Sequence, residues 1–166
     1  MTSSTHLDSA GHARMIDVSG KAPSRRIARA SGAIRMSRGA LSALMQGELP
    51  KGDAFAVARV AGIQAAKRTP DLVPLCHPLS LDHVSVEVEA DEGLPGVRVR
   101  SEIVVTARTG AELEALAAVA GALLSIYDMS KSLDRGMSLE AIQLESKEGG
   151  KSGDWRRKNT DREGQK

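Results

Sequence analysis

The sequence predicts an α+β domain, in which helices pack on one face of a mainly antiparallel sheet. Two segments that alternate apolar and polar residues flank a Gly/Pro-containing connection, which is typical of a β-hairpin. Two long segments repeat small or apolar residues at helical spacing. Only 2% of the 166 residues are aromatic, so the core must consist of aliphatic and small side chains, which favours close helix packing. The length suits a single domain.

The first half of the chain predicts one strand and two helices. Residues 27–36 alternate small or apolar side chains with polar ones, as a strand with one solvated face does. Ser37 can cap a short helix that Gly47 stops. Asp53 can cap a longer helix to Lys67, whose small residues indicate that another backbone approaches closely. Three prolines predict that residues 69–79 are extended and stiff.

The second half predicts a hairpin of residues 84–90 and 97–106, a long helix over 110–133 and a last strand over 138–146. This order of elements indicates a ferredoxin-like arrangement. We therefore expect a flexible N-terminal arm (1–14), a single catalytic domain (15–147) and a Gly-rich, basic C-terminal tail (148–166). Within residues 147–166, seven Lys or Arg stand against four Asp or Glu, whereas the preceding residues are nearly neutral.

Composition narrows the classes of function. A single cysteine, Cys76, rules out an intrachain disulfide, cannot form a thiolate zinc site and fits a reducing compartment. The four histidines show no metal-ligand spacing, so we expect no metal and no cofactor. Residues 1–14 lack the apolar stretch of a signal peptide, and we expect no segment that crosses a membrane. These observations predict a cytoplasmic protein.

On the second long helix, the helical wheel places Lys131 at the centre of an apolar stripe and Asp128 at its edge. The stripe consists of Leu113, Leu116, Ala117, Ala120, Leu123, Leu124 and Tyr127. On the wheel alone, a surface Asp–Lys pair three residues apart is the favoured interpretation. The alternative is that Asp128 holds an ammonium group for acid–base work, with Lys131 in a pocket at the end of the stripe.

Other candidates precede this pair in the chain. Lys51 lies beside a helix N-terminus, where it could hold a phosphate or transfer protons, although an exposed loop lysine is an equal alternative. His77 is held extended by the proline that follows, although a histidine bonded to nearby backbone is slightly favoured. Cys76 and His77 should point in opposite directions, which argues against a catalytic dyad. Thr109 and Glu112 form a capping-box pattern, whereas Glu114 is freer to face a ligand.

Taken together, several short segments resemble the cyclic pyranopterin monophosphate synthase family, the C proteins (MoaC) of molybdenum cofactor biosynthesis. The resemblance covers about residues 15–154 in order, and the ordered set is highly specific although no single segment is decisive. The segments are Met15-Ile16-Asp17-Val18-Ser19, Lys51-Gly52-Asp53, residues 58–67, Leu75-Cys76-His77-Pro78, residues 112–116, Tyr127-Asp128-Met129-Ser130-Lys131 and residues 149–153. The chain departs from the family pattern where Leu113 replaces a usual Met and Ser130 a frequent Cys.

The resemblance implies a lyase that converts (8S)-3',8-cyclo-7,8-dihydroguanosine 5'-triphosphate to cyclic pyranopterin monophosphate and diphosphate by lysine/aspartate acid–base chemistry. It implies a ferredoxin-like homohexamer, a trimer of dimers, with active sites at subunit interfaces. Asp128, Lys131, Lys51 and His77 are the catalytic candidates. Substrate-binding candidates are Leu75, Cys76, His77, Glu112, Leu113 and Glu114, with Arg26, Lys67, Arg108 and Lys147 for the triphosphate.

Two other functions are weighed against this one. An RNA-binding module of the same fold would stack bases on strand aromatics, and Phe55, Tyr127 and Trp155 all lie outside the predicted strands. The body of the chain is also nearly neutral, so we expect no nucleic acid partner. A non-catalytic nucleotide-binding or assembly protein is the second alternative, which a Lys131→Ala variant distinguishes.

Overall fold

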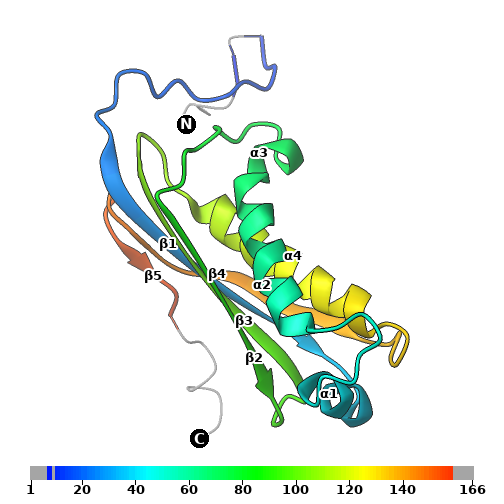
Figure 1. The fold of residues 1–166 in the computed structure, drawn as a ribbon. Helices are drawn as coiled ribbons and strands as arrows, with labels where there is room; N and C mark the ends of the chain where they lie inside the picture. The colour runs from blue at the N-terminus through cyan, green and yellow to red at the C-terminus, as the bar shows by residue number, and fades with distance from the viewer. Residues whose placement is uncertain (1–6, 9, 159–166) are drawn as a thin grey trace, which may run out of the picture.

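The computed structural model describes residues 7, 8 and 10–158 and confirms the α+β, ferredoxin-like prediction. In chain order, its elements (Figure 1) are β1 (Ser24–Arg35), α1 (Arg38–Met45), α2 (Ala54–Lys67), α3 (Thr69–Leu72), β2 (His83–Asp91), β3 (Gly96–Ala107), α4 (Glu112–Ser130), β4 (Ser138–Glu148) and β5 (Trp155–Arg156).

The sheet has the strand order β2-β3-β1-β4-β5, and every neighbouring pair is antiparallel. The β2–β3 hairpin pairs His83 with Val104 at one end and Asp91 with Gly96 at the other. The β1–β4 pairing is irregular, with register shifts in the middle of β1 and with Ala141 of β4 at a φ of 50°. Such a bulge lets β4 bend across the sheet.

Helices α2 and α4 lie side by side on one face of the sheet (Figure 1). The prediction that small residues of α2 allow a close backbone approach is confirmed. A Cβ added to Gly62 would lie 2.8 Å from the carbonyl oxygen of Ala118 on α4, and one added to Gly121 would lie 2.5 Å from the Cβ of Ala65. Because small side chains line this contact, the two helices can both rest on the sheet.

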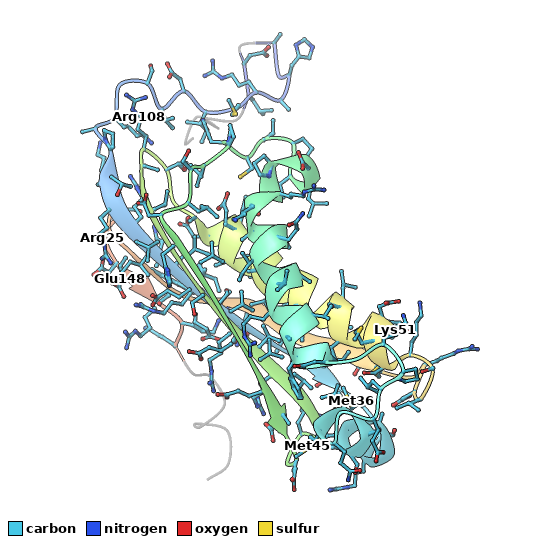
Figure 2. All side chains as sticks on the ribbon, in the orientation of Figure 1. Arg25, Met36, Met45, Lys51, Arg108 and Glu148 are labelled. Atoms are coloured by element: carbon cyan, nitrogen blue, oxygen red, sulfur yellow. The ribbon has the colours of Figure 1, made fainter. Side chains whose placement is uncertain are left out.

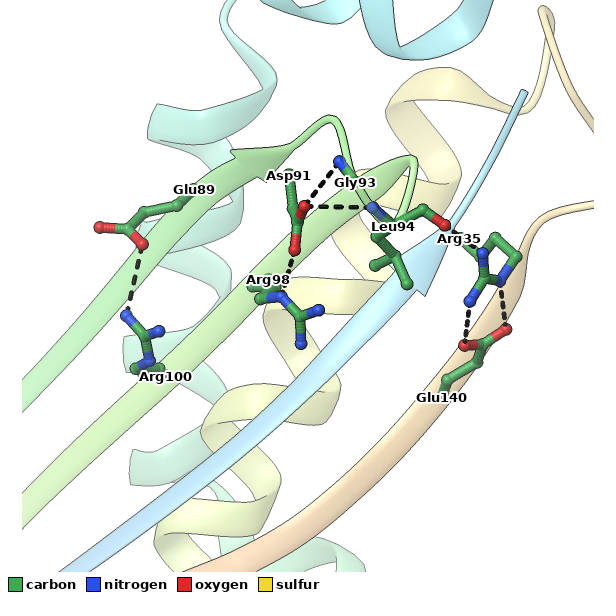
Figure 3. A network of polar contacts seen from close by, with 8 residues as sticks. All are labelled: Arg35, Glu89, Asp91, Gly93, Leu94, Arg98, Arg100 and Glu140. Carbon is green, nitrogen blue, oxygen red and sulfur yellow. Dashed lines mark hydrogen bonds and ion pairs between the residues drawn. The ribbon is translucent and has the colours of Figure 1, made fainter. Parts of the chain in front are cut away.

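The opposite face of the sheet is solvated and carries paired charges (Figure 3). Glu140 accepts two hydrogen bonds from the Arg35 guanidinium, with Nε–Oε1 at 3.0 Å and Nη2–Oε2 at 3.4 Å. Further along, Arg100 pairs with Glu89 at 3.3 Å, and Arg98 pairs with Asp91. This face therefore has the polar alternation that the strands predicted.

Two local predictions were wrong. Residues 69–72 form the short helix α3 instead of extended chain, because Pro70 occupies a first-turn position where its missing N–H is not needed. The second wrong prediction is that every aromatic residue lies outside the strands, because Trp155 belongs to β5, which pairs it with Lys147 of β4. Trp155 is therefore an aromatic residue on a strand, although β5 is only two residues long and lies at the sheet edge.

Helix α4 is long and apolar enough to cross a membrane by length and composition. Its residues Ala115, Ala118, Val119, Ala122 and Leu123 are nevertheless fully buried against the rest of the domain. The helix is thus the central core helix of this fold, and its apolar composition serves packing on both the sheet and α2.

Candidate functional site

The predicted site residues fall into two groups at opposite ends of α4. Lys51, Asp128 and Lys131 lie at its C-terminal end and are called the ammonium–carboxylate cluster here. At the N-terminal end, a cavity of about 350 Å³ is called the α4 N-terminal pocket. Its lining includes six of the predicted substrate-binding residues, namely Leu75, Cys76, His77, Glu112, Leu113 and Glu114.

In the ammonium–carboxylate cluster, Asp128 is bound by two lysines at once. Its Oδ1 lies 2.7 Å from Lys131 Nζ and its Oδ2 lies 2.7 Å from Lys51 Nζ. Lys51 Nζ also donates to the backbone oxygen of Asp128 at 3.0 Å. The hydrogen bond from Lys131, and then that from Lys51, lower the pKa of Asp128 to about 2. The carboxylate therefore stays ionised at neutral pH.

The local backbone explains how the lysines reach Asp128. Lys51 stands in the connection between α1 and α2, where Gly52 has a φ of 89° that glycine adopts without strain. Lys131 is the C-cap of α4, and its N–H still donates to the oxygen of Tyr127 at 2.9 Å. The side chains of Lys51, Asp128 and Lys131 are each about half exposed, at 47%, 55% and 52%. The cluster is open to a ligand.

The predicted apolar stripe of α4 does not form its buried face. Of the stripe, Leu123 is fully buried, but Leu113 and Leu124 are 40% and 60% exposed. The rest of the side that packs inward consists mainly of alanines with Val119 and Ile126. The wheel favoured the large side chains, but the close approach of α2 selects small ones for burial. Lys131 therefore lies next to exposed apolar side chains of α4, not at the end of a buried apolar face.

In the α4 N-terminal pocket, Cys76 contacts Glu114, with its Sγ 3.5 Å from Oε1. Glu114 is 1% exposed, and its Oε2 has no hydrogen-bond partner among the described residues. Burial raises the pKa of Glu114 above its usual value. Burial, and then the charge of Glu114, raise the pKa of Cys76 to about 11. Cys76 is thus a thiol rather than a nucleophilic thiolate.

His77 is tied to the N-terminal segment of the chain. Its Nε2 lies 2.9 Å from the backbone oxygen of Ile16, and a carbonyl only accepts hydrogen bonds. A neutral ring must therefore carry its proton on Nε2, which leaves Nδ1 as the basic nitrogen. The backbone contact favoured from the sequence is present, and Ile16, Val18 and Lys21 line the pocket, which the sequence did not indicate.

Three of the basic candidates lie on the strands and turns next to this pocket. Arg26 donates to the backbone oxygens of Ala107 and Arg108, at 3.2 and 3.3 Å. Arg108 donates to the oxygen of Lys21 at 3.0 Å. Lys147 Nζ lies 2.5 Å from Ser152 Oγ and 4.0 Å from Glu112 Oε1.

The predicted capping box at the start of α4 does not form. The helix begins at Glu112, so the N-cap is Ala111, and no side chain caps it. The Glu112 carboxylate is instead near Lys147. Lys67, the fourth basic candidate, is exposed at the C-terminal end of α2.

A larger hollow of about 500 Å³ lies on the open face of the sheet, away from both groups. In its lining, Arg29 pairs with Glu102 at 2.7 Å. It contains none of the predicted site residues. Among the described residues, no three His, Cys, Asp or Glu side chains are placed to hold a metal ion.

The two groups are too far apart to act on one small molecule within a single copy. Glu112 and Asp128 are sixteen residues apart on α4, and at roughly 1.5 Å per residue this corresponds to about 24 Å. Figure 2 shows the same separation, with Arg108 and Lys51 labelled at opposite ends of the molecule. The structure thus brings the predicted residues into two half-sites, not into one site.

Comparison with known proteins gives a consistent picture. A model of the MoaC family matches residues 15–150. A cyclic pyranopterin monophosphate synthase of Methylobacterium sp. (strain 4-46) is 54% identical over 155 residues, which cover 93% of this chain and 97% of that protein. A protein of the same name from Novosphingobium aromaticivorans is 54% identical over 158 residues, covering 94% of this chain and 98% of the relative.

Proposed function

The chain belongs to the MoaC family, and from that premise we propose that it is a cyclic pyranopterin monophosphate synthase of molybdenum cofactor biosynthesis. The substrate we propose is (8S)-3',8-cyclo-7,8-dihydroguanosine 5'-triphosphate, and the products are cyclic pyranopterin monophosphate and diphosphate. The identity of 54% along nearly the whole length of both relatives supports the activity. The residues of the two half-sites support the finer assignment.

The observation that carries the mechanism is the position of the half-sites at opposite ends of α4. We propose that one copy supplies the α4 N-terminal pocket and a second copy supplies the ammonium–carboxylate cluster. A two-fold axis that brings these ends together would generate two such sites in each dimer. Each complete site would then contain His77 and Glu114 from one subunit and Lys51, Asp128 and Lys131 from the other.

The charges of this combined site suit the proposed reaction. Arg26, Arg108 and Lys147 supply cations for a triphosphate, and Lys67 at the C-terminal end of α2 is a further candidate. A ribose hydroxyl would attack the α-phosphorus, forming the cyclic phosphate ester as the bond to the leaving diphosphate breaks. The hydroxyl proton must pass to a base, and the cations stabilise the charge on the leaving diphosphate.

The ring rearrangement requires repeated proton transfers. Asp128, which remains ionised, holds the two lysine ammonium groups in place through the 2.7 Å contacts. Lys131 and Lys51 are therefore positioned to donate protons and His77 Nδ1 to accept one. We propose lysine/aspartate acid–base catalysis on this basis, with His77 as a further proton acceptor.

We also propose that the chain assembles as a homohexamer, a trimer of dimers, that works in the cytoplasm without a nucleic acid or membrane partner. Large apolar side chains are exposed on the face of the domain that the helices form. Monomeric proteins rarely expose large apolar patches, so this face is a candidate subunit interface. The exposed side chains are Val57 and Val60 of α2 and Leu113 and Leu124 of α4.

The first test is product formation from the cyclised substrate by wild type and by Lys131→Ala. We expect wild type to release diphosphate and a pterin, and the variant to remain folded and assembled while losing turnover. Unchanged turnover in Lys131→Ala would contradict the catalytic assignment. Retained binding without product in the wild type would instead favour a non-catalytic assembly protein.

The second test addresses the shared site. Lys131→Ala and His77→Ala each inactivate one half-site, so each homo-oligomer should be inactive. After the two variants are unfolded and refolded together, half of the dimers are mixed, and one of the two sites in each mixed dimer is intact. Turnover should then recover to about one quarter of the wild-type value. No recovery, with mixed assembly shown by mass spectrometry, would place both half-sites on one chain.

A further inference from the structure

The contact between Cys76 and Glu114 joins two segments that are 38 residues apart in the sequence. Cys76 lies in the proline-containing segment after α3, and Glu114 lies in the first turn of α4. Their neighbours Leu75, His77 and Leu113 line the α4 N-terminal pocket. Any shift between the two segments would therefore change the walls of that pocket.

Glu114 is not a free surface carboxyl group. It is almost completely buried, and its Oε2 has no partner among the described residues. The only side-chain hydrogen bond that the structure gives its carboxyl comes from Cys76. A buried carboxyl with a single side-chain partner depends on that partner for its orientation.

We propose that Cys76 is a positioning residue, whose thiol donates a hydrogen bond to Oε1 of Glu114 and so fixes the proline-containing segment against α4. This inference rests on the proposed function, because it assigns Cys76 a role in the same pocket. Cys76 then acts on the substrate through the placement of Leu75, His77 and Leu113, not through its sulfur. The raised pKa of the thiol supports this role, since a donor must keep its proton.

The activity test uses three substitutions of Cys76. Ala and Val remove the donor and bracket the volume of cysteine, whereas Ser keeps a donor. We expect Cys76→Ala and Cys76→Val to raise KM by about fivefold to tenfold, the range for one lost hydrogen bond, with a smaller change in kcat. Cys76→Ser should remain within about twofold of wild type. Equal losses in all three variants, or no loss in any, would overturn the proposal.

A second test does not depend on activity, because Cys76 is the only cysteine of the chain. The rate of alkylation by iodoacetamide, followed against pH, reports the ionisation of this thiol alone. In wild type we expect a midpoint well above that of an ordinary thiol. Glu114→Gln removes the neighbouring carboxyl and should lower that midpoint.

Glu112→Gln is the matched control for the alkylation test. Glu112 also lines the pocket on α4, but its carboxylate is near Lys147 and not near Cys76. Lys21 and His77 are the other titratable groups of the pocket lining and are unchanged in both variants. An equal midpoint in wild type and Glu114→Gln, or an equal shift in both variants, would refute the contact. Absence of product in wild type would refute the proposed function alone.

Discussion

Asp128 binds two ammonium groups, and this double pairing determines how the cluster responds to pH. Its pKa falls from 3.8 to about 2 in the folded chain, mainly through the hydrogen bonds from Lys131 and Lys51. A lowered folded-state pKa contributes stability that is present above 3.8 and is lost as the pH falls through about 2. Solvent screening keeps this contribution small, since the carboxylate is half exposed.

For Asp128→Asn we therefore expect a pH-dependent loss of stability. The wild type should unfold at a higher temperature than the variant near neutral pH, and the difference should shrink steadily below about pH 4. Thermal unfolding followed by circular dichroism measures this difference in unfolding temperature at each pH. Asp71→Asn, on α3 and without an ion pair among the described residues, should show no such trend. A difference that grows on acidification would contradict the pairing.

Two buried serines of the core allow a matched comparison. Ser130 is fully buried, and its Oγ has no partner among the described residues, whereas Ser101 Oγ donates to the oxygen of Ala115 at 2.8 Å. Ser130→Ala removes a desolvated hydroxyl and should leave the free energy of unfolding unchanged or raise it by up to about 1 kcal/mol. Ser101→Ala should lower it by about 1 kcal/mol. Urea titrations measure both, and equal losses would show that Ser130 has an unseen partner.

At the scale of the elements, the contact between α2 and α4 depends on glycine. The added Cβ of Gly62→Ala would meet the backbone oxygen of Ala118 at 2.8 Å, and backbone cannot move aside as a flexible side chain can. We expect this variant to lose about 1–3 kcal/mol of unfolding free energy. Gly39→Ala, in α1 with nothing within 4 Å of the added Cβ, should instead gain about 0.5–1 kcal/mol.

The ends of the helices show which features the local sequence pattern predicts correctly. The predicted caps at Ser37 and Asp53 are confirmed. Each side chain accepts a hydrogen bond from the backbone N–H three residues further along the chain, that of Ala40 and that of Ala56. The capping box at Thr109 was wrong, because α4 begins at Glu112 and its N-cap is Ala111. The Glu112 carboxylate is instead near Lys147 of β4. A cap depends on neighbours in sequence, but a long charged side chain also meets neighbours that only the fold provides.

At the scale of the whole molecule, the exposed apolar side chains of the helical face predict an interface. Leu124→Lys changes a residue that is 60% exposed, so the subunit should still fold. We expect this variant to lower the oligomeric mass seen by light scattering and to reduce turnover in parallel, because the proposed sites need two copies. Met45→Lys, 49% exposed on α1, is the control. A native mass for Leu124→Lys would exclude this face as an interface.

The sequence by itself determined the α+β class, the caps of α1 and α2 and the identity of the chemical groups, because hydrophobic period, cap residues and ordered motifs are properties of neighbouring residues. It also indicated that small residues of α2 would meet another backbone. Only the tertiary structure decided which side of α4 is buried, because that depends on how closely α2 approaches. It likewise decided that Lys51 pairs with Asp128 and that Cys76 contacts Glu114, because these partners come from segments distant in the sequence.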